Sequence, residues 1–178
     1  MPLTSNVSPH MNKLRLRLMY KEGLQRLRDA ETLSEAMALG EQSDSPYLLS
    51  LLGLELLLKF VFEAVLCKPG RGHEYEKLFN ELPSDIQARL LCLAGERVGP
   101  SALAKNHESV LQEWGQNFIA LRYPWERYTT LTEKQYLSAG NEWIAKGAPL
   151  EDATFQYYPE ELVGFLAALR LVAAEVAT

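Results

Sequence analysis

The chain has 178 residues, of which 47% are hydrophobic and 23% charged, and its formal net charge is −5. These values are ordinary for a globular protein and exclude a largely disordered chain. A chain of this length buries roughly 70% of its unfolded surface, so its core needs neither a disulfide nor a structural metal. The only cysteines, Cys67 and Cys92, lie in apolar stretches, which predicts buried free thiols in a reducing compartment.

The N-terminal region differs from the rest in polarity and charge. Residues 1–12 are polar and contain two prolines, which predicts a flexible tail, with no secretory signal. We therefore expect a cytoplasmic protein with one helical domain at 13–178. From Lys13 to Arg28 there are six basic residues and one acidic residue, so this segment carries +5 and the remainder −10. Such an element binds nucleic acid, or it is a solvated helix face that pairs with the acidic body.

The first helix is predicted from two successive patterns. Leucines alternate with basic residues from Leu14 to Tyr20, which is strand periodicity, and apolar residues then recur every three or four positions up to Met37. We expect a helix that starts between Lys13 and Tyr20 and ends at Gly40. A short edge strand is the alternative for its start.

The most apolar segment runs from Tyr47 to about Cys67. Its apolar residues surround most of the helix circumference, so we expect a central helix that is covered on most sides. Glu55, Lys59 and Glu63 follow at intervals of four and form one narrow polar stripe. Each of these charges costs about 2.5–3.5 kcal/mol at a bilayer centre, which argues against a transmembrane helix and against a membrane partner.

Apolar periodicity between turn signals predicts further helical segments downstream. They lie at 74–82, 84–94, 103–122, 132–147 and from Pro159 onward. Capping-box patterns begin at Ser84 and Thr132, and Pro124 stops or kinks the long helix before it. The expected fold is an all-α, antiparallel helical bundle of about five to six helices.

Standard catalytic motifs are absent from the sequence: there is no P-loop, no dinucleotide-binding glycine pattern, no G-x-S-x-G elbow and no HExxH. The histidines at 10, 73 and 107 lack the mutual spacing of metal ligands. No metal and no cofactor is therefore expected. A two-carboxylate hydrolase is compatible with the spacing, but no pair of acids is singled out.

Three polar segments stand out by their order and spacing. The central helix carries Glu55–Lys59, the glycine turn leads into Gly72–Phe79, and the long helix ends in Phe118–Glu126, which contains F-x-x-x-R-Y-x-x-E. Together they resemble the HEPN superfamily of helical bundles, over about residues 14–128 and, less specifically, the last helix. The resemblance implies a homodimer. Many HEPN proteins are metal-independent ribonucleases with an R-x(4–6)-H motif shared across the dimer.

The ribonuclease motif is incomplete in this chain. Arg122 matches its arginine, but the histidine would fall at 127–129, where Arg127, Tyr128 and Thr129 stand. Without the histidine, the general acid–base group has no equivalent in the motif. The resemblance then implies a non-catalytic domain that binds RNA or a nucleotide, in phage defence or a toxin–antitoxin system.

The predicted ligand-binding surface joins side chains from all three segments. Its members are Glu55, Lys59, His73, Arg122, Glu126, Arg71 and Arg127. The cations would hold phosphate, and Trp125 and Tyr128 would stack a base or pack in the core or at a dimer contact.

Simpler roles and other functions stay open. Glu55–Lys59 is also explained as an intrahelical pair, His73 as a partner of Glu55, and Arg122–Glu126 as an i, i+4 pair. One alternative function is a metal-independent endoribonuclease that uses Arg122 and a displaced histidine, His73. Another is a structural or antitoxin-type subunit that binds a protein such as a nucleotidyltransferase or a toxin.

Overall fold

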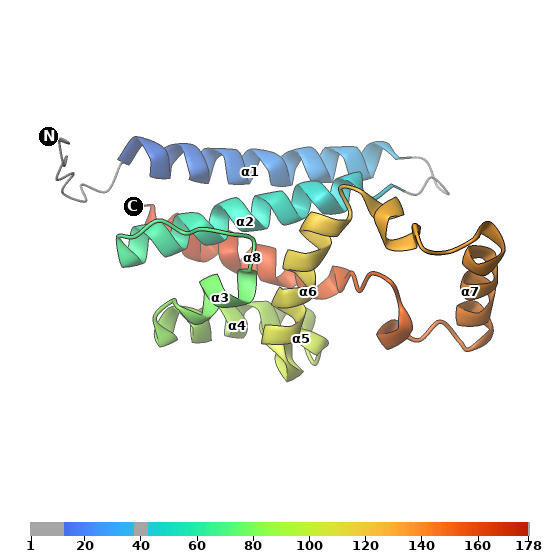
Figure 1. Cartoon of the computed structure of the whole chain (residues 1–178). Coiled ribbons are helices and arrows are strands. Elements are labelled where there is room, and N and C mark those ends of the chain that lie inside the picture. Colours follow the sequence, from blue (N-terminus) through green and yellow to red (C-terminus); the bar gives the residue numbers. More distant parts are fainter. Residues whose placement is uncertain (1–12, 38–42, 178) are drawn as a thin grey trace, which may run out of the picture.

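The structure, a computed structural model, describes residues 13–37 and 43–177. All regular elements of these residues are helical, so the predicted all-α bundle is confirmed (Figure 1). The described part contains eight α-helices and two 3₁₀ helices, η1 and η2. They are α1 (Lys13–Ala36), α2 (Ser45–Leu66), α3 (Tyr75–Asn80), α4 (Ser84–Val98), α5 (Ala102–Lys105), α6 (His107–Ala120), η1 (Pro124–Tyr128), α7 (Glu133–Ala145), η2 (Leu150–Asp152) and α8 (Pro159–Val176).

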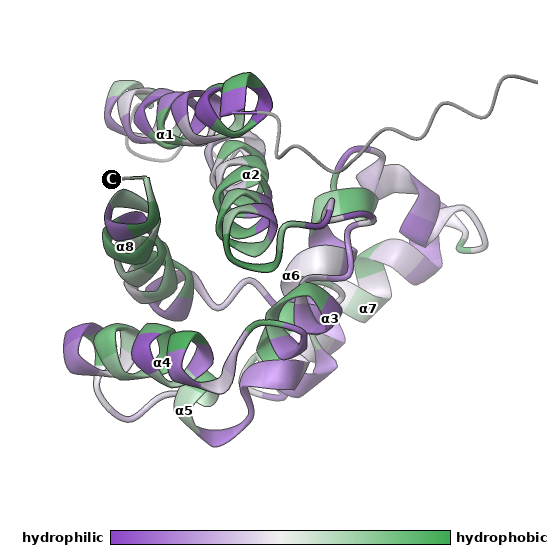
Figure 2. Cartoon of the chain, turned by 90° about the vertical axis from the view of Figure 1, so that its left-hand side faces the viewer, coloured by the Kyte–Doolittle hydropathy of each residue, from purple (hydrophilic) through white to green (hydrophobic). Residues whose placement is uncertain are grey.

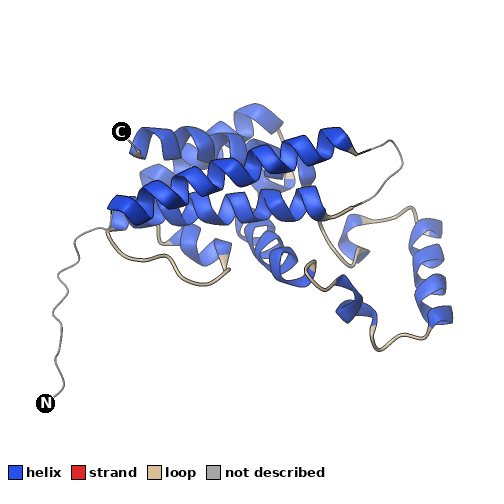
Figure 3. Ribbon diagram, turned by 90° about the horizontal axis from the view of Figure 1, so that it is seen from above, coloured by secondary structure: helices blue, strands red, loops and turns tan. Residues whose placement is uncertain are grey.

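The two longest helices, α1 and α2, lie side by side and run antiparallel (Figures 1 and 3). The first helix is confirmed and is helical from Lys13, so the edge-strand alternative is wrong. Leu16 is buried whereas Leu14 and Leu18 are exposed, because only one leucine of the alternating run falls on the face toward the bundle. The predicted tail at 1–12 and the predicted helix end at Gly40 lie outside the described residues.

The central position of α2 is confirmed, because it contacts α1, α8 and α6, and Figure 2 shows its largely hydrophobic ribbon between them. The approach of α1 to α2 depends on Gly53, where an added Cβ would lie 2.4 Å from Cδ2 of Leu27. The described residues include no helix that is long and apolar enough to cross a membrane.

Downstream helix boundaries differ from the predictions. The helix from Ser84 reaches Val98, and its predicted capping box is wrong. Instead, the Gln87 amide donates to the carbonyls of Asn80 and Leu82, at 3.1 and 2.7 Å. The predicted 103–122 helix is divided at Asn106, because the Asn106 side chain accepts a hydrogen bond from the backbone N–H of Ser109 and caps α6.

Both cysteines are free, but the prediction that they are buried is wrong. Cys67 follows the last residue of α2 in a left-handed conformation, with φ 53°. Cys92 lies on the exposed side of α4, where its Sγ is 3.6 Å from a carboxylate oxygen of Glu96. At both positions the neighbouring residues in the sequence are apolar, but the cysteine itself is exposed, so apolar neighbours alone did not predict its burial correctly.

Residues 124–154, which include α7, form an arm that stands apart from the other helices (Figures 1 and 3). The predicted capping box at Thr132 is confirmed, because Thr132 and Gln135 exchange side chain–backbone hydrogen bonds. Within α7, 12 of 13 residues are exposed, and Trp143 is partly buried. The helix is therefore stabilised by its own caps and receives little support from tertiary packing.

The C-terminal base of the arm is tied to the bundle by side chains that donate hydrogen bonds to the backbone carbonyls of Gln156 and Tyr157. The amide of Asn117, which is buried, donates to the carbonyl of Gln156 at 2.9 Å. Trp114 Nε1 and the Tyr47 hydroxyl both donate to the carbonyl of Tyr157, at 3.2 and 3.0 Å. These bonds fix where the chain re-enters the bundle before α8.

Candidate functional site

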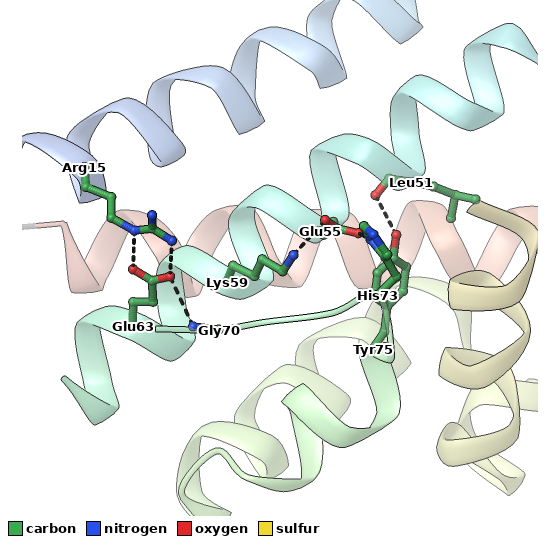
Figure 4. Close-up of polar contacts among 8 residues, drawn as sticks. All are labelled: Arg15, Leu51, Glu55, Lys59, Glu63, Gly70, His73 and Tyr75. Atoms are coloured by element: carbon green, nitrogen blue, oxygen red, sulfur yellow. Dashed lines mark hydrogen bonds and ion pairs between the residues drawn. The ribbon is translucent and has the colours of Figure 1, made fainter. Parts of the chain in front are cut away.

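The polar stripe of α2 is centred on Glu55, which is only 6% exposed. One of its carboxylate oxygens accepts from Lys59 Nζ at 2.8 Å, and the other lies 2.6 Å from His73 Nδ1 (Figure 4). An ionised carboxylate only accepts, so Nδ1 carries the proton that it donates. The second ring nitrogen of His73, Nε2, is then the one left for another partner, on a side chain that is 41% exposed.

The far end of the same stripe has a structural role. Glu63 is buried and accepts two hydrogen bonds from the guanidinium of Arg15, at 2.8 and 2.9 Å. It also accepts from the backbone N–H of Gly70 at 3.1 Å. Glu63 therefore joins α1 to the loop that leads to His73 (Figure 4). This Arg15 contact is one instance of the basic N-terminal segment pairing with the acidic body.

A close approach between the loop and α6 positions the backbone of His73. A Cβ added at Gly115 would lie 2.4 Å from the carbonyl oxygen of His73. Only glycine leaves this space, so Gly115 sets how closely the 73–75 segment lies against α6.

Tyr75 lies directly beneath this network and is fully buried. Its hydroxyl donates to the carbonyl of Leu51 at 3.3 Å (Figure 4). Burial first, and then the charge of Glu55, raise the pKa of Tyr75 well above its usual value, and the charge of Arg122 opposes this. Tyr75 is thus a neutral donor in the floor of the site.

The ring of Phe118 lies next to both His73 and Arg122. The ring centroids of His73 and Phe118 are 5.4 Å apart. The guanidinium carbon of Arg122 lies 4.3 Å from the centroid of Phe118, and Arg122 Nε donates to the Phe118 carbonyl at 3.0 Å. His73 and Arg122 therefore share this ring, and Glu55 and Lys59 are linked to it through the contact of Glu55 with His73. We call these four residues and Phe118 the polar cluster.

The other predicted site residues lie elsewhere. Arg71 lines a separate groove of about 210 Å³ together with Lys68 and Lys77. Arg127 places its guanidinium 5.4 Å from the ring of Phe155. Glu126 is exposed on η1.

The i, i+4 pair expected between Arg122 and Glu126 does not form. No ion pair of residues 13–37 and 43–177 joins them. The reason is local: α6 ends at Ala120, so Arg122 and Glu126 are not on one helix.

An exposed aromatic pair follows Arg122 in sequence. The ring centroids of Tyr123 and Trp125 are 5.2 Å apart in an edge-on arrangement, and both side chains are exposed. Tyr128 instead packs against Tyr136 at the start of the arm helix, at 4.9 Å. Sequence reasoning did not identify Tyr75, Gly115 or Phe118 as parts of the site. A glycine inside a helical pattern signals close backbone approach, and this would have marked Gly115.

Comparison of the chain with protein-family models, with curated proteins and with solved structures gives no match. In the part of the chain that the structure describes, no group of three or more histidine, cysteine or acidic side chains is placed to hold a metal ion.

Proposed function

We propose that the polar cluster binds a phosphate group of RNA or of a nucleotide, in a domain without the usual HEPN ribonuclease activity. The observation that carries this proposal is the shared contact of His73 and Arg122 with Phe118. Arginine presents a planar fork of donors that suits phosphate oxygens. A histidine that donates through Nδ1 to a carboxylate also donates through Nε2 to an anion when its ring carries both protons, because an unprotonated Nε2 only accepts.

The neighbouring aromatic rings support a ligand that carries a base. Tyr123 directly follows Arg122 and packs edge-on against Trp125. An exposed aromatic ring stacks on any base, with a typical contribution of about 1–3 kcal/mol. Phosphate at Arg122 and a base at Tyr123 or Trp125 describe a single-stranded RNA segment or a nucleotide.

A second candidate function is favoured by the 2.6 Å contact between His73 and Glu55. A buried carboxylate that orients a histidine is a common arrangement for general acid–base catalysis. In a metal-independent endoribonuclease, Nε2 of His73 would accept the proton of a 2′-hydroxyl and Arg122 would stabilise charge on the phosphate. Purified protein that leaves RNA uncut, or cleavage that survives His73→Ala, contradicts this candidate.

Fluorescence anisotropy with a labelled single-stranded RNA, and with ATP as competitor, tests the binding proposal at low ionic strength. We expect Arg122→Ala to weaken binding at least tenfold. Arg97→Ala, at an exposed arginine near the end of α4, is the matched control and should change little. No binding at low salt, or binding that is unaffected by Arg122→Ala, would refute the proposal.

A further inference from the structure

The groove at the start of the arm helix is lined mainly by aromatic side chains. It lies between η1 and the first turn of α7 and has a volume of about 480 Å³. Three of its seven lining residues, Trp125, Tyr128 and Tyr136, are aromatic, whereas aromatic residues make up only 10% of the chain. The groove therefore concentrates aromatic rings in a space whose volume is typical of small-ligand sites.

The three rings form walls of different orientation. The ring centroids of Tyr128 and Tyr136 are 4.9 Å apart, and the ring planes are at 77° to one another. Trp125 is 59% exposed and is contacted edge-on by Tyr123. The faces of an aromatic ring carry partial negative charge, so rings at steep angles around one space attract a cation.

The one charged residue among those that line the groove is an acid, Glu133. Its carboxylate forms no ion pair with any of residues 13–37 and 43–177. The whole chain carries −5, which also favours a positively charged ligand. The carboxylate and the rings therefore favour a ligand of the same sign, a cation.

The arginines nearest to the groove in sequence are directed toward other rings. The guanidinium carbon of Arg127 lies 5.4 Å from the centroid of Phe155, and that of Arg122 lies 4.3 Å from the centroid of Phe118. Neither arginine lines the groove. The described part of the chain thus supplies the rings and the carboxylate of a cation site, but no cationic side chain that fills it.

We propose that this groove binds a small quaternary ammonium compound, with the three rings around its trimethylammonium group and Glu133 beside the charge. A primary ammonium has three N–H donors that each need an acceptor, whereas a quaternary ammonium has none. The hydroxyl of Thr132, which also lines the groove, already exchanges hydrogen bonds with Gln135. The main partners that the groove offers are rings and one carboxylate, which suits a cation without N–H groups.

The start of α7 does not favour an anion in the same place. The capping box pairs the backbone N–H of Thr132 with the Gln135 side chain, and the backbone N–H of Gln135 with the Thr132 hydroxyl. These two donors are therefore not offered to a phosphate, and Glu133 in the first turn offsets the positive end of the helix dipole. No residue of the polar cluster lines the groove, so the two sites are separate and suit ligands of opposite charge.

Titration of the full chain with choline, followed by NMR, tests the proposal. We expect saturable shifts of the Trp125 indole N–H signal and of the backbone amides at 125–136. Neohexanol, the neutral analogue with a tert-butyl group in place of trimethylammonium, should bind at least tenfold more weakly. This comparison uses only the parent chain, so it does not depend on the folding of a variant. Equal affinity for the two compounds, no saturable shifts with choline, or stronger binding of adenosine at the same signals would overturn the proposal.

Substitutions separate the contribution of the rings from that of the carboxylate. Tyr136→Leu removes a ring but keeps an apolar side chain, and it should weaken choline binding at least fivefold, whereas Tyr136→Phe should bind like the parent chain. Glu133→Gln should also weaken binding severalfold. Glu142→Gln, at another exposed acid of α7, is the matched control and should change nothing.

The outcomes distinguish this groove from the phosphate site. Tyr136→Leu should leave RNA binding unchanged, because Tyr136 lies outside the polar cluster. Choline binding that survives both Tyr136→Leu and Glu133→Gln would contradict the assignment of the groove. Tighter binding of a trimethyllysine peptide than of choline would contradict a small-molecule ligand.

Discussion

Nδ1 of His73 lies 2.6 Å from Oε2 of Glu55, although 18 residues separate the two in sequence. The contact joins the buried central helix to the loop that precedes α3, and it leaves the other side of the imidazole toward solvent. Together with Lys59, it satisfies a carboxylate that would otherwise be costly to bury. The polar cluster is therefore part of the fold and is not a loose surface feature.

Removing the charge of Glu55 should destabilise the protein. In Glu55→Gln, Lys59 and His73 lose their common partner, and we expect a loss of about 1–3 kcal/mol in the free energy of unfolding, measured by urea denaturation. Glu22→Gln removes an exposed carboxylate that pairs with Arg26 and should cost at most about 0.5 kcal/mol. Equal losses in the two variants would show that the buried pairing is unimportant.

The close approach at Gly115 should be sensitive to a single methyl group. Gly115→Ala brings a Cβ into the carbonyl of His73, so we expect a loss of about 1–3 kcal/mol in stability together with weaker RNA binding. Gly95→Ala is the matched control, because its Cβ would meet open space within α4. It should stabilise the protein by about 0.5–1 kcal/mol. Two variants of equal stability would contradict the predicted steric clash.

Buried tyrosines should make stability fall at alkaline pH. Burial raises the pKa of Tyr47 above its usual value, so the unfolded chain releases this proton first. Stability is then full below about pH 10 and declines above it, by up to about 1.4 kcal/mol per pH unit for each such group. Urea unfolding on both sides of pH 10 should show a shallower decline in Tyr47→Phe. The exposed Tyr123→Phe is the control, and an unchanged slope in Tyr47→Phe would contradict the assignment.

The base of the arm should depend on Asn117. Asn117→Ala leaves the Gln156 carbonyl without its 2.9 Å donor, and we expect a loss of about 1–3 kcal/mol in the free energy of unfolding. Faster hydrogen exchange at residues 153–158 should accompany it. Asn141→Ala, on the exposed arm helix, should change neither quantity. If hydrogen exchange at 153–158 is unaffected by Asn117→Ala, the amide does not anchor the arm.

Helix positions were largely predictable from the sequence, because α2 and α8 have strong start signals and continuous apolar faces. The capping box predicted at Ser84 does not form, because the Gln87 side chain donates instead to backbone carbonyls that precede α4. Asn106 broke a continuous apolar pattern because its side chain caps a new helix. The local sequence shows neither which carbonyl groups Gln87 contacts nor that Asn106 caps a new helix.

Part of the candidate site was also predictable. The Glu55–Lys59 spacing fixes that pair on one helix, and the glycine turn brings His73 back toward it. The expected pairing of Arg122 with Glu126 assumed that the helix continues through Arg122. Because α6 ends at Ala120, the Arg122 side chain instead packs on the ring of Phe118, four residues earlier, and donates to its carbonyl.

The salt dependence of RNA binding by the parent chain, Arg122→Ala, His73→Ala and the double variant tests the central claim most directly. Each phosphate contact on a single strand contributes about 0.7 to the slope of log affinity against log salt. We predict a reduced slope in Arg122→Ala and a smaller combined loss in the double variant than the two single losses together, because both residues serve one phosphate. Undetectable binding of RNA and nucleotide at low salt, or identical slopes in all four proteins, would contradict the account.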